Sequence, residues 1–157
     1  MHTVIEKPVR SSSVVSIATR FGTIDINTDN AFSFEHGPLG LPGKHQFCLV
    51  DFLKNQDDQF KLFQCIDDFD TNFIVIPAAY QNNFIDSQDL DEACETLDIA
   101  ADRLLLLFIV SAEKKHEQPT KQFFINIKAP ILINIENRTA NQYVFQSPEY
   151  DVRRQIA

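Results

Sequence analysis

The most regular part of this chain is a pair of alternating apolar runs near its C-terminal end. Apolar side chains recur on every second residue from Phe123 to Ile127, and again from Ile131 to Ile135. Because successive side chains of a β-strand point to opposite faces of a sheet, each run predicts a strand with one apolar face. Pro130 lies between them and lacks the N–H that a neighbouring strand would bind, so it predicts a bulge or an edge position. A chain with this pattern builds much of its core on a β-sheet.

Other strand patterns occur along the rest of the chain. Leu104 to Val110 is apolar throughout, which is typical of a strand buried on both faces or of a short buried helix segment. A turn at residues 137–141 is expected to lead into a last strand that contains Tyr143 and Phe145. The remaining predicted strands are Thr23–Asn27, Gln46–Leu53, Lys61–Ile66 after a polar turn at Asn55–Asp58, and Asn72–Ile76, which is expected to stop at Pro77.

One segment has helical periodicity. Residues 87–97 are predicted to form a helix capped by Asp86 or Ser87, with an apolar stripe of Leu90, Ala93, Cys94 and Leu97. Roughly nine short strands, one short helix and no repeat or linker predict a single, mainly β domain over residues 14–157, a small barrel or a sandwich. Residues 1–13, which include Pro8 and three consecutive serines, are predicted to form a flexible leader.

The stretch FEHGPLGLPG, residues 34–43, holds three of the four glycines of the chain. A phosphate-binding P-loop needs a lysine and then a serine or threonine directly after its second glycine. Here Leu41 follows Gly40, and Gly43 leads into a predicted strand instead of a helix. Proline with a fixed φ and glycine with a positive φ are the ordinary means of making a tight turn, so the stretch predicts a structural turn.

Charge and composition limit the possible partners. The chain has 22 acidic and 14 basic residues, a net charge of −8, which opposes direct binding to nucleic-acid phosphates and suits a basic protein partner. The longest apolar run, Leu104 to Val110, is too short to cross a membrane, and no secretion signal precedes it. We therefore expect a cytoplasmic protein that does not act at a membrane.

No pattern of catalytic or metal-binding residues is apparent. The histidines are scattered, the three cysteines form no CxxC pair, and the Asp67-Asp68 pair is more typical of a solvated turn than of an acid–base pair. We expect no cofactor, no metal and no enzymatic activity. A catalytic pairing of His36 or His45 with Asp67 is the enzyme alternative.

Three segments, in this order, form a recognisable pattern. They are Phe32-Ser33-Phe34 followed by Gly37 and Gly40-Leu41-Pro42-Gly43; Leu62 to Asp68 followed by Phe73 to Pro77; and Asn126 to Asn134 followed by Arg138, Ala140, Gln142 and Tyr150. Together they make the chain similar to the FliW family of flagellar assembly factors over about residues 15–154. The chain departs from the family pattern at Lys44-His45, Phe69 and Ile76.

The resemblance implies a non-enzymatic protein with two protein partners that exclude each other. Members of the family bind newly made flagellin, and they also bind the carbon storage regulator CsrA, an RNA-binding repressor of flagellin translation. Flagellin that accumulates occupies the factor and frees the repressor, and export of flagellin reverses this. The alternative is a small β-barrel module that binds a metabolite or a peptide and has no link to motility.

Seven polar residues are candidates for partner binding, and Asp67 and Asp68 are the candidates for contact with the repressor. Several of the seven lie inside predicted strands, where a polar side chain can instead close hydrogen bonds of the sheet or of a bulge. Both interpretations stand at this point. The candidates are Gln64, Asp67, Asp68, Asn126, Asn134, Arg138 and Gln142.

Overall fold

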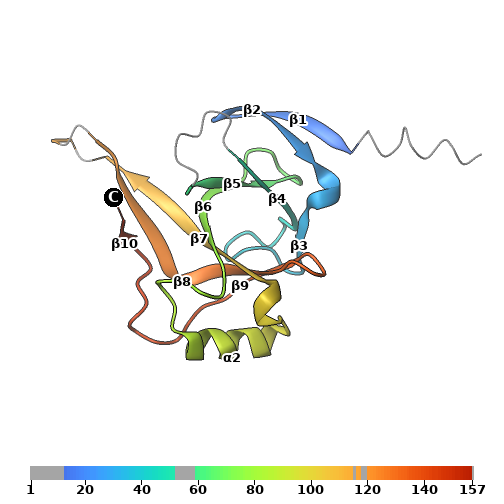
Figure 1. The fold of residues 1–157 in the computed structure, drawn as a ribbon. Helices are drawn as coiled ribbons and strands as arrows, with labels where there is room; N and C mark the ends of the chain where they lie inside the picture. Colours follow the sequence, from blue (N-terminus) through green and yellow to red (C-terminus); the bar gives the residue numbers. More distant parts are fainter. Residues whose placement is uncertain (1–12, 52–58, 115, 118–119, 157) are drawn as a thin grey trace, which may run out of the picture.

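The computed structural model describes residues 13–51, 59–114, 116–117 and 120–156. Most strands in these ranges form a barrel, and the remaining elements pack against its outside (Figure 1). The helix α2 spans Ser87–Leu97, and short 3-10 helices span Thr28–Asn30 and Ala101–Arg103. The strands are β1 (Val14–Thr19), β2 (Gly22–Asn27), β3 (Phe32–Phe34), β4 (Gln46–Val50), β5 (Lys61–Cys65), β6 (Asn72–Ala78), β7 (Leu104–Glu113), β8 (Gln122–Asn134), β9 (Thr139–Gln142) and β10 (Arg154–Gln155).

Strands β3 to β9 close into a seven-stranded barrel. From β3 to β9 each strand pairs antiparallel with the next one along the chain. The ring closes where β9 pairs with β3 in parallel, with Ser33 opposite Thr139 and Phe34 opposite Ala140. Closure leaves none of these strands as an open sheet edge. The prediction of a mainly β, barrel-like domain with one short helix is confirmed.

The barrel is packed on both its inner and outer surfaces. Inside, the rings of Phe47 and Phe63 stack with their centroids 4.9 Å apart. Outside, helix α2 and the C-terminal segment cover strands β6 to β8, where Leu90 is fully buried. The antiparallel pair β1–β2 covers β4 and β5 on the other flank and buries Ile17 and Ile24. These layers fix the positions of the loops between strands.

Strand β8 corrects the prediction of two separate strands. It continues through Pro130, but its register with β7 shifts: Leu107 faces Ile131, whereas Ile109 faces Asn126. Residues 127–130 therefore form the predicted bulge, and the C-terminal segment satisfies its backbone, because the carbonyl of Pro130 accepts a hydrogen bond from the N–H of Tyr143. Pro130 lies off the regular ladder, so its missing N–H leaves no gap in the sheet.

Three further expectations differ from the structure. Strand β6 does not stop at Pro77 but continues to Ala78, because pairing with β5 ends at Val75 and Pro77 is paired only with β7. The last predicted strand begins earlier: β9 spans Thr139–Gln142 and ends before Tyr143. Strands β1, β3 and β10 were not expected. Residues 1–12 of the predicted leader, residues 52–53 of a predicted strand and the turn at 55–58 lie outside the described residues.

Helix α2 begins and ends where its apolar stripe predicts. Asp86 occupies the N-cap position but makes no side-chain cap bond; its N–H donates to the Tyr150 hydroxyl, which in turn donates to the Asp89 carboxylate. Burial, together with the hydrogen bond to Asp89, raises the pKa of Tyr150 to about 12, so this link between helix and C-terminal segment holds at neutral pH. The helix ends at Asp98, which has a φ of 57°.

Candidate functional site

Residues 35–45, here called the glycine loop, connect β3 to β4 and are held in one conformation by backbone geometry. The N–H of Leu41 donates to the Pro38 carbonyl at 2.9 Å, and the N–H of Lys44 donates to the Leu41 carbonyl at 3.1 Å. Gly37 has a φ of +81°, and a Cβ at this position would lie 2.2 Å from the Leu41 carbonyl oxygen. The structural turn that the sequence predicts here is confirmed.

The predicted residues Asp67 and Asp68 bind this loop to residues 66–71, here called the acidic turn. The Asp67 carboxylate accepts the N–H groups of His45 at 2.7 Å and Gln46 at 3.0 Å. Asp68 forms an ion pair with Lys44 at 3.2 Å. Hydrogen bonds from the Asp70 N–H and the Thr71 hydroxyl, together with Lys44, lower the pKa of Asp68 and keep it charged.

Two of the predicted residues, Gln64 and Gln142, form hydrogen bonds to the same two segments. Gln64 is fully buried, and its side-chain amide donates to the carbonyls of Cys65 at 2.9 Å and Phe69 at 3.0 Å. Gln142 accepts the N–H of Leu39 at 2.8 Å and donates to the carbonyl of Ala129 at 2.9 Å. Four of the seven candidates therefore converge on the glycine loop and the acidic turn.

The other three candidates lie elsewhere on β8 and on the turn that follows it. Asn126 closes the bulge by accepting the N–H of Ala129 at 3.0 Å. Asn134 is buried and accepts the N–H of Glu136 at 3.0 Å. Arg138 donates from Nε to the carbonyl of Ala31 at 3.3 Å. These side chains shape the barrel and its β8–β9 turn.

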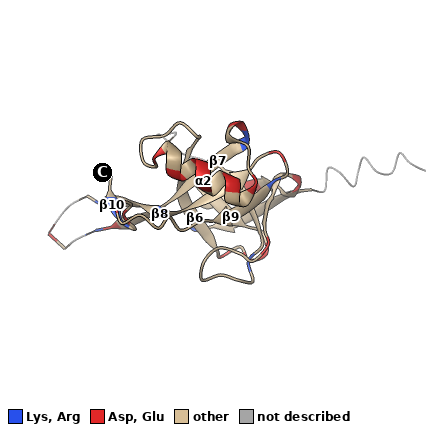
Figure 2. Ribbon diagram, turned by 90° about the horizontal axis from the view of Figure 1, so that it is seen from below, with Lys and Arg blue, Asp and Glu red and all other residues tan. Residues whose placement is uncertain are grey.

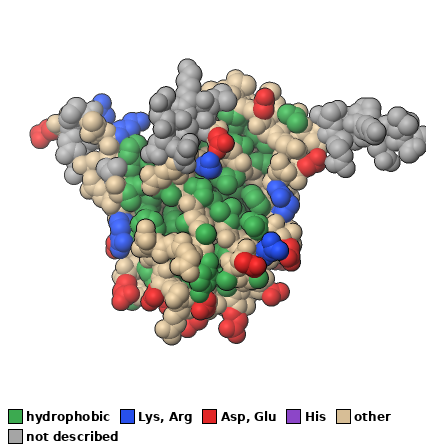
Figure 3. All heavy atoms as spheres, viewed as in Figure 1, with side chains coloured by type: hydrophobic (Ala, Val, Ile, Leu, Met, Phe, Trp, Pro, Cys, Tyr) green, Lys and Arg blue, Asp and Glu red, His purple; other side chains and the backbone are tan. Residues whose placement is uncertain are grey.

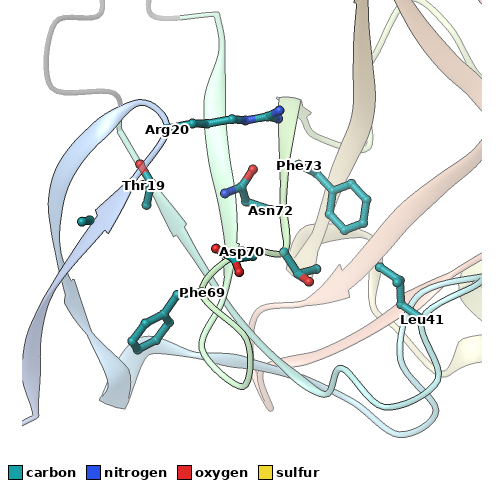
Figure 4. A pocket seen from close by; sticks show the side chains of 9 residues that line it. Thr19, Arg20, Leu41, Phe69, Asp70, Asn72 and Phe73 are labelled. Atoms are coloured by element: carbon teal, nitrogen blue, oxygen red, sulfur yellow. The ribbon is translucent and has the colours of Figure 1, made fainter.

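A surface trough lies beside the acidic turn (Figure 4). One hollow of about 370 Å³ is lined by Leu41, Phe69 and Phe73 among others, and a second of about 430 Å³ continues past Ile74 to Lys121. The two share Arg20, Asn72 and Phe73, so they form one trough. Figure 4 shows Arg20 reaching from the β1–β2 turn toward β6. We refer below to this surface as the trough.

Most of the trough was not anticipated from the sequence. Arg20 and Lys121 stand in no recognisable motif and are brought together only by the fold. One signal was present: Phe69 is a large apolar residue directly after two aspartates, and it is 45% exposed. A single exposed phenylalanine is ordinary on a protein surface, and only the fold shows that Phe69 lines the same hollow as Leu41 and Phe73.

Helix α2 carries a second distinctive surface. From Asp86 to Asp98 the chain has six acidic residues and no basic one. Figure 2 marks acidic positions in red along the ribbon of the helix, and in Figure 3 acidic side chains gather at the lower edge of the molecule, where Figure 1 places α2. No other described helix or strand carries as many acidic residues.

Neither a metal centre nor a reactive thiol can be assembled from the residues that the structure describes. No group of histidine, cysteine and carboxylate side chains there could hold a metal ion. Burial raises the pKa of Cys48 to about 11 and also raises the pKa values of Cys65 and Cys94, so the thiols stay protonated and unreactive at neutral pH. No helix in the described ranges is long and apolar enough to cross a membrane.

The fold and the site define a closed β-barrel protein whose polar side chains hold the glycine loop and the acidic turn by hydrogen bonds. The chain belongs to the FliW family, whose model, described as FliW protein, matches residues 16–156. It is 34% identical to the flagellar assembly factor FliW of Thermoanaerobacter pseudethanolicus, over 87% of this chain and 88% of that protein. It is 31% identical to the protein of the same name from Caldanaerobacter subterraneus, with the same coverage.

The fold also matches a solved structure. A crystal structure of the flagellar assembly factor FliW superposes with a TM-score of 0.66 at 23% identity, covering 90% of this chain and 96% of the other. The chain therefore has the same overall fold as that structure.

Proposed function

We propose that this chain is a cytoplasmic flagellar assembly factor that binds flagellin and the carbon storage regulator CsrA in alternation, without catalysing a reaction. Its FliW family membership and the name flagellar assembly factor among its relatives support this proposal. The observation that supports the repressor as a partner is the charge of the chain, because a net charge of −8 favours association with a basic RNA-binding protein.

Asp67 and Asp68 remain the proposed contact for the repressor. Both lie on the acidic turn at the surface, although each also has a structural partner there. A repressor seated on this turn would bring its cationic groups beside carboxylates and would meet Phe69 and Asp70, which line the trough. The acidic face of α2 is the competing location for the same contact.

The other five candidates are proposed to act on binding indirectly. Gln64 and Gln142 set the backbone of the acidic turn and the glycine loop, so their replacement would displace the proposed contact surface without removing a contacting atom. Strand β8 and the turn after it depend for their shape on hydrogen bonds of Asn126, Asn134 and Arg138. These three residues are proposed to affect binding through that shape.

Competition between the partners tests the proposed function. The complex with CsrA is formed first, flagellin is titrated in, and the released repressor is measured by size-exclusion chromatography. We expect flagellin to displace the repressor in proportion to its occupancy. A ternary complex would contradict alternation, and failure of the chain to bind either protein would contradict the function itself.

A pair of amide variants tests the assignment of the repressor contact. Asp67→Asn and Asp68→Asn together keep an oxygen that can accept the loop hydrogen bonds but remove both charges. We expect the affinity for CsrA to fall roughly tenfold, since close charge pairs across an interface contribute more than 1.4 kcal/mol. The control is Glu92→Gln with Glu95→Gln on α2; a larger loss in that control would move the contact to the helix.

A further inference from the structure

Strand β1 leaves one edge of the β1–β2 pair open. The N–H of Thr28 donates to the carbonyl of Ser13 at 3.0 Å, and from there β1 pairs with β2 without interruption. Because hydrogen-bonded and non-hydrogen-bonded residues alternate along an antiparallel pair, the N–H and carbonyl groups of Val14, Ser16 and Ala18 point away from β2. No described strand pairs with this edge of β1. These backbone groups are therefore open to a strand added from outside.

The edge carries none of the features that usually prevent strand addition. Natural sheets protect an open edge with charged side chains, proline, a bulge or a very short edge strand. Strand β1 has six residues, VVSIAT, with no charge, no proline and no shift of register. By contrast, β10 has only two residues, and β2 carries Asp25 on its outer edge and meets β4 at Asn27, whose carbonyl accepts the Cys48 thiol at 3.7 Å. Among the described strands outside the barrel, β1 has the least protected edge.

A hollow with apolar side chains continues from the end of this edge. Ala18 and Thr19 line the hollow of about 370 Å³ together with Leu41, Phe69 and Phe73. Figure 4 shows Phe69 extending from the acidic turn toward the β1–β2 pair. A strand that runs along β1 and past Thr19 would therefore enter this hollow.

These features specify a partner by its backbone and by its pattern of side chains. A helix already uses its backbone groups internally, so only an extended segment can bond to the edge. In an added strand, side chains on the barrel side would extend the layer of Val15 and buried Ile17, whereas the side chains between them would face solvent. The two charged side chains that line the hollow, Arg20 and Asp70, have opposite signs and favour neither an acidic nor a basic segment.

We propose that the open edge of β1 binds an extended polypeptide segment of a partner protein by β-strand addition. The segment makes main-chain hydrogen bonds to Val14, Ser16 and Ala18 and places one large apolar side chain beside Phe69. It has apolar residues at alternate positions and polar residues between them. This binding requires neither partner of the proposed function, so its failure would leave that function standing.

Selection from a phage-displayed library of random peptides of about ten residues, with the full chain as target, tests the proposal. We expect the enriched peptides to alternate apolar and polar residues. The strongest of them, made synthetically, should slow hydrogen exchange at the amides of Ser16 and Ala18 by about tenfold or more.

Three variants locate the bound peptide by titration calorimetry. Ala18→Pro removes an N–H from the open edge and should weaken binding by at least about tenfold. Phe69→Ser leaves β1 unchanged and should weaken binding by about fivefold through the lost apolar contact. The control is Thr23→Pro, because Thr23 lies opposite Ala18 on β2 and points its N–H to the other edge of the pair; it should change the affinity by less than about twofold.

Each contrary result overturns the proposal. Enrichment of peptides without alternation, or of none, would exclude strand addition at this site. Equal affinity for the unaltered chain and Ala18→Pro, or equal losses in Ala18→Pro and Thr23→Pro, would show that the peptide does not bind through this edge. Slow exchange at the amides of Ser16 and Ala18 without peptide would show that another part of the chain or a second copy already covers the edge.

Discussion

At the scale of single residues, the glycine loop depends on one position more than on its neighbours. Gly37 and Gly40 both have positive φ, at +81° and +83°, but a Cβ at Gly37 would meet the carbonyl oxygens of Leu41 at 2.2 Å and Lys44 at 2.9 Å. A Cβ at Gly40 would meet nothing within 4 Å. The first glycine is therefore needed for space and for conformation, and the second for conformation alone.

This difference predicts unequal losses of stability. Gly40→Ala should lower the free energy of unfolding by about 1 kcal/mol, the cost of a left-handed alanine. Gly37→Ala should lower it by about 3 kcal/mol, because the backbone must also move to relieve the overlap. Urea unfolding followed by circular dichroism measures both. Equal losses would show that the loop relaxes around Gly37 without strain.

The polar motif residues show what sequence can and cannot reveal at this scale. The resemblance selected side chains that the structure places at critical hydrogen bonds, such as Gln64 and Gln142. It could not reveal whether a polar side chain points outward to a partner or inward to a loop, since both uses require the same residue type at the same position. Only burial and the identity of the bonded atoms separate them.

At the scale of elements, alternation in the sequence predicted most strands, whereas pairing decided where they end. The runs on either side of Pro130 look like two strands because a proline usually ends a ladder. In the structure they form β8, since the C-terminal segment and Asn126 satisfy the backbone of the bulge. The trough lay beyond prediction for a similar reason: Arg20 and Lys121 are distant in sequence and line one hollow only when the β1–β2 pair has packed on the barrel.

The bulge predicts a specific effect of substitution at Asn126. Asn126→Ala leaves the N–H of Ala129 without its acceptor and should lower the free energy of unfolding by about 1–2 kcal/mol. Asn126→Asp keeps a side-chain oxygen as acceptor and should lose less. Hydrogen exchange at the amide of Ala129 reports the bond directly and should be faster only in the alanine variant. Unchanged exchange in both variants would show that the bulge holds without this side chain.

At the scale of the whole molecule, the ring is closed by a short parallel contact between β3 and β9. Arg138 reinforces it: its guanidinium lies 4.9 Å from the Phe32 ring centroid and donates to the carbonyls of Ala31 and Asn30. The N–H of Ser33 donates back to the Arg138 carbonyl at 2.9 Å. One side chain thus joins the start of the barrel to its end, far apart along the chain.

Because a closed barrel has no strand that can separate without breaking two ladders, loss of this contact should weaken the entire fold. We expect Arg138→Ala to lower the free energy of unfolding by about 2 kcal/mol in a single cooperative transition. The matched control is Arg153→Ala, which removes another arginine that stacks on a ring, Phe124, and pairs with Glu113, but at the exposed end of β8. The control should cost under about 1 kcal/mol, as for other exposed ion pairs. A similar loss in both variants, or a separate early transition in Arg138→Ala, would show that the β3–β9 contact is not what holds the barrel closed.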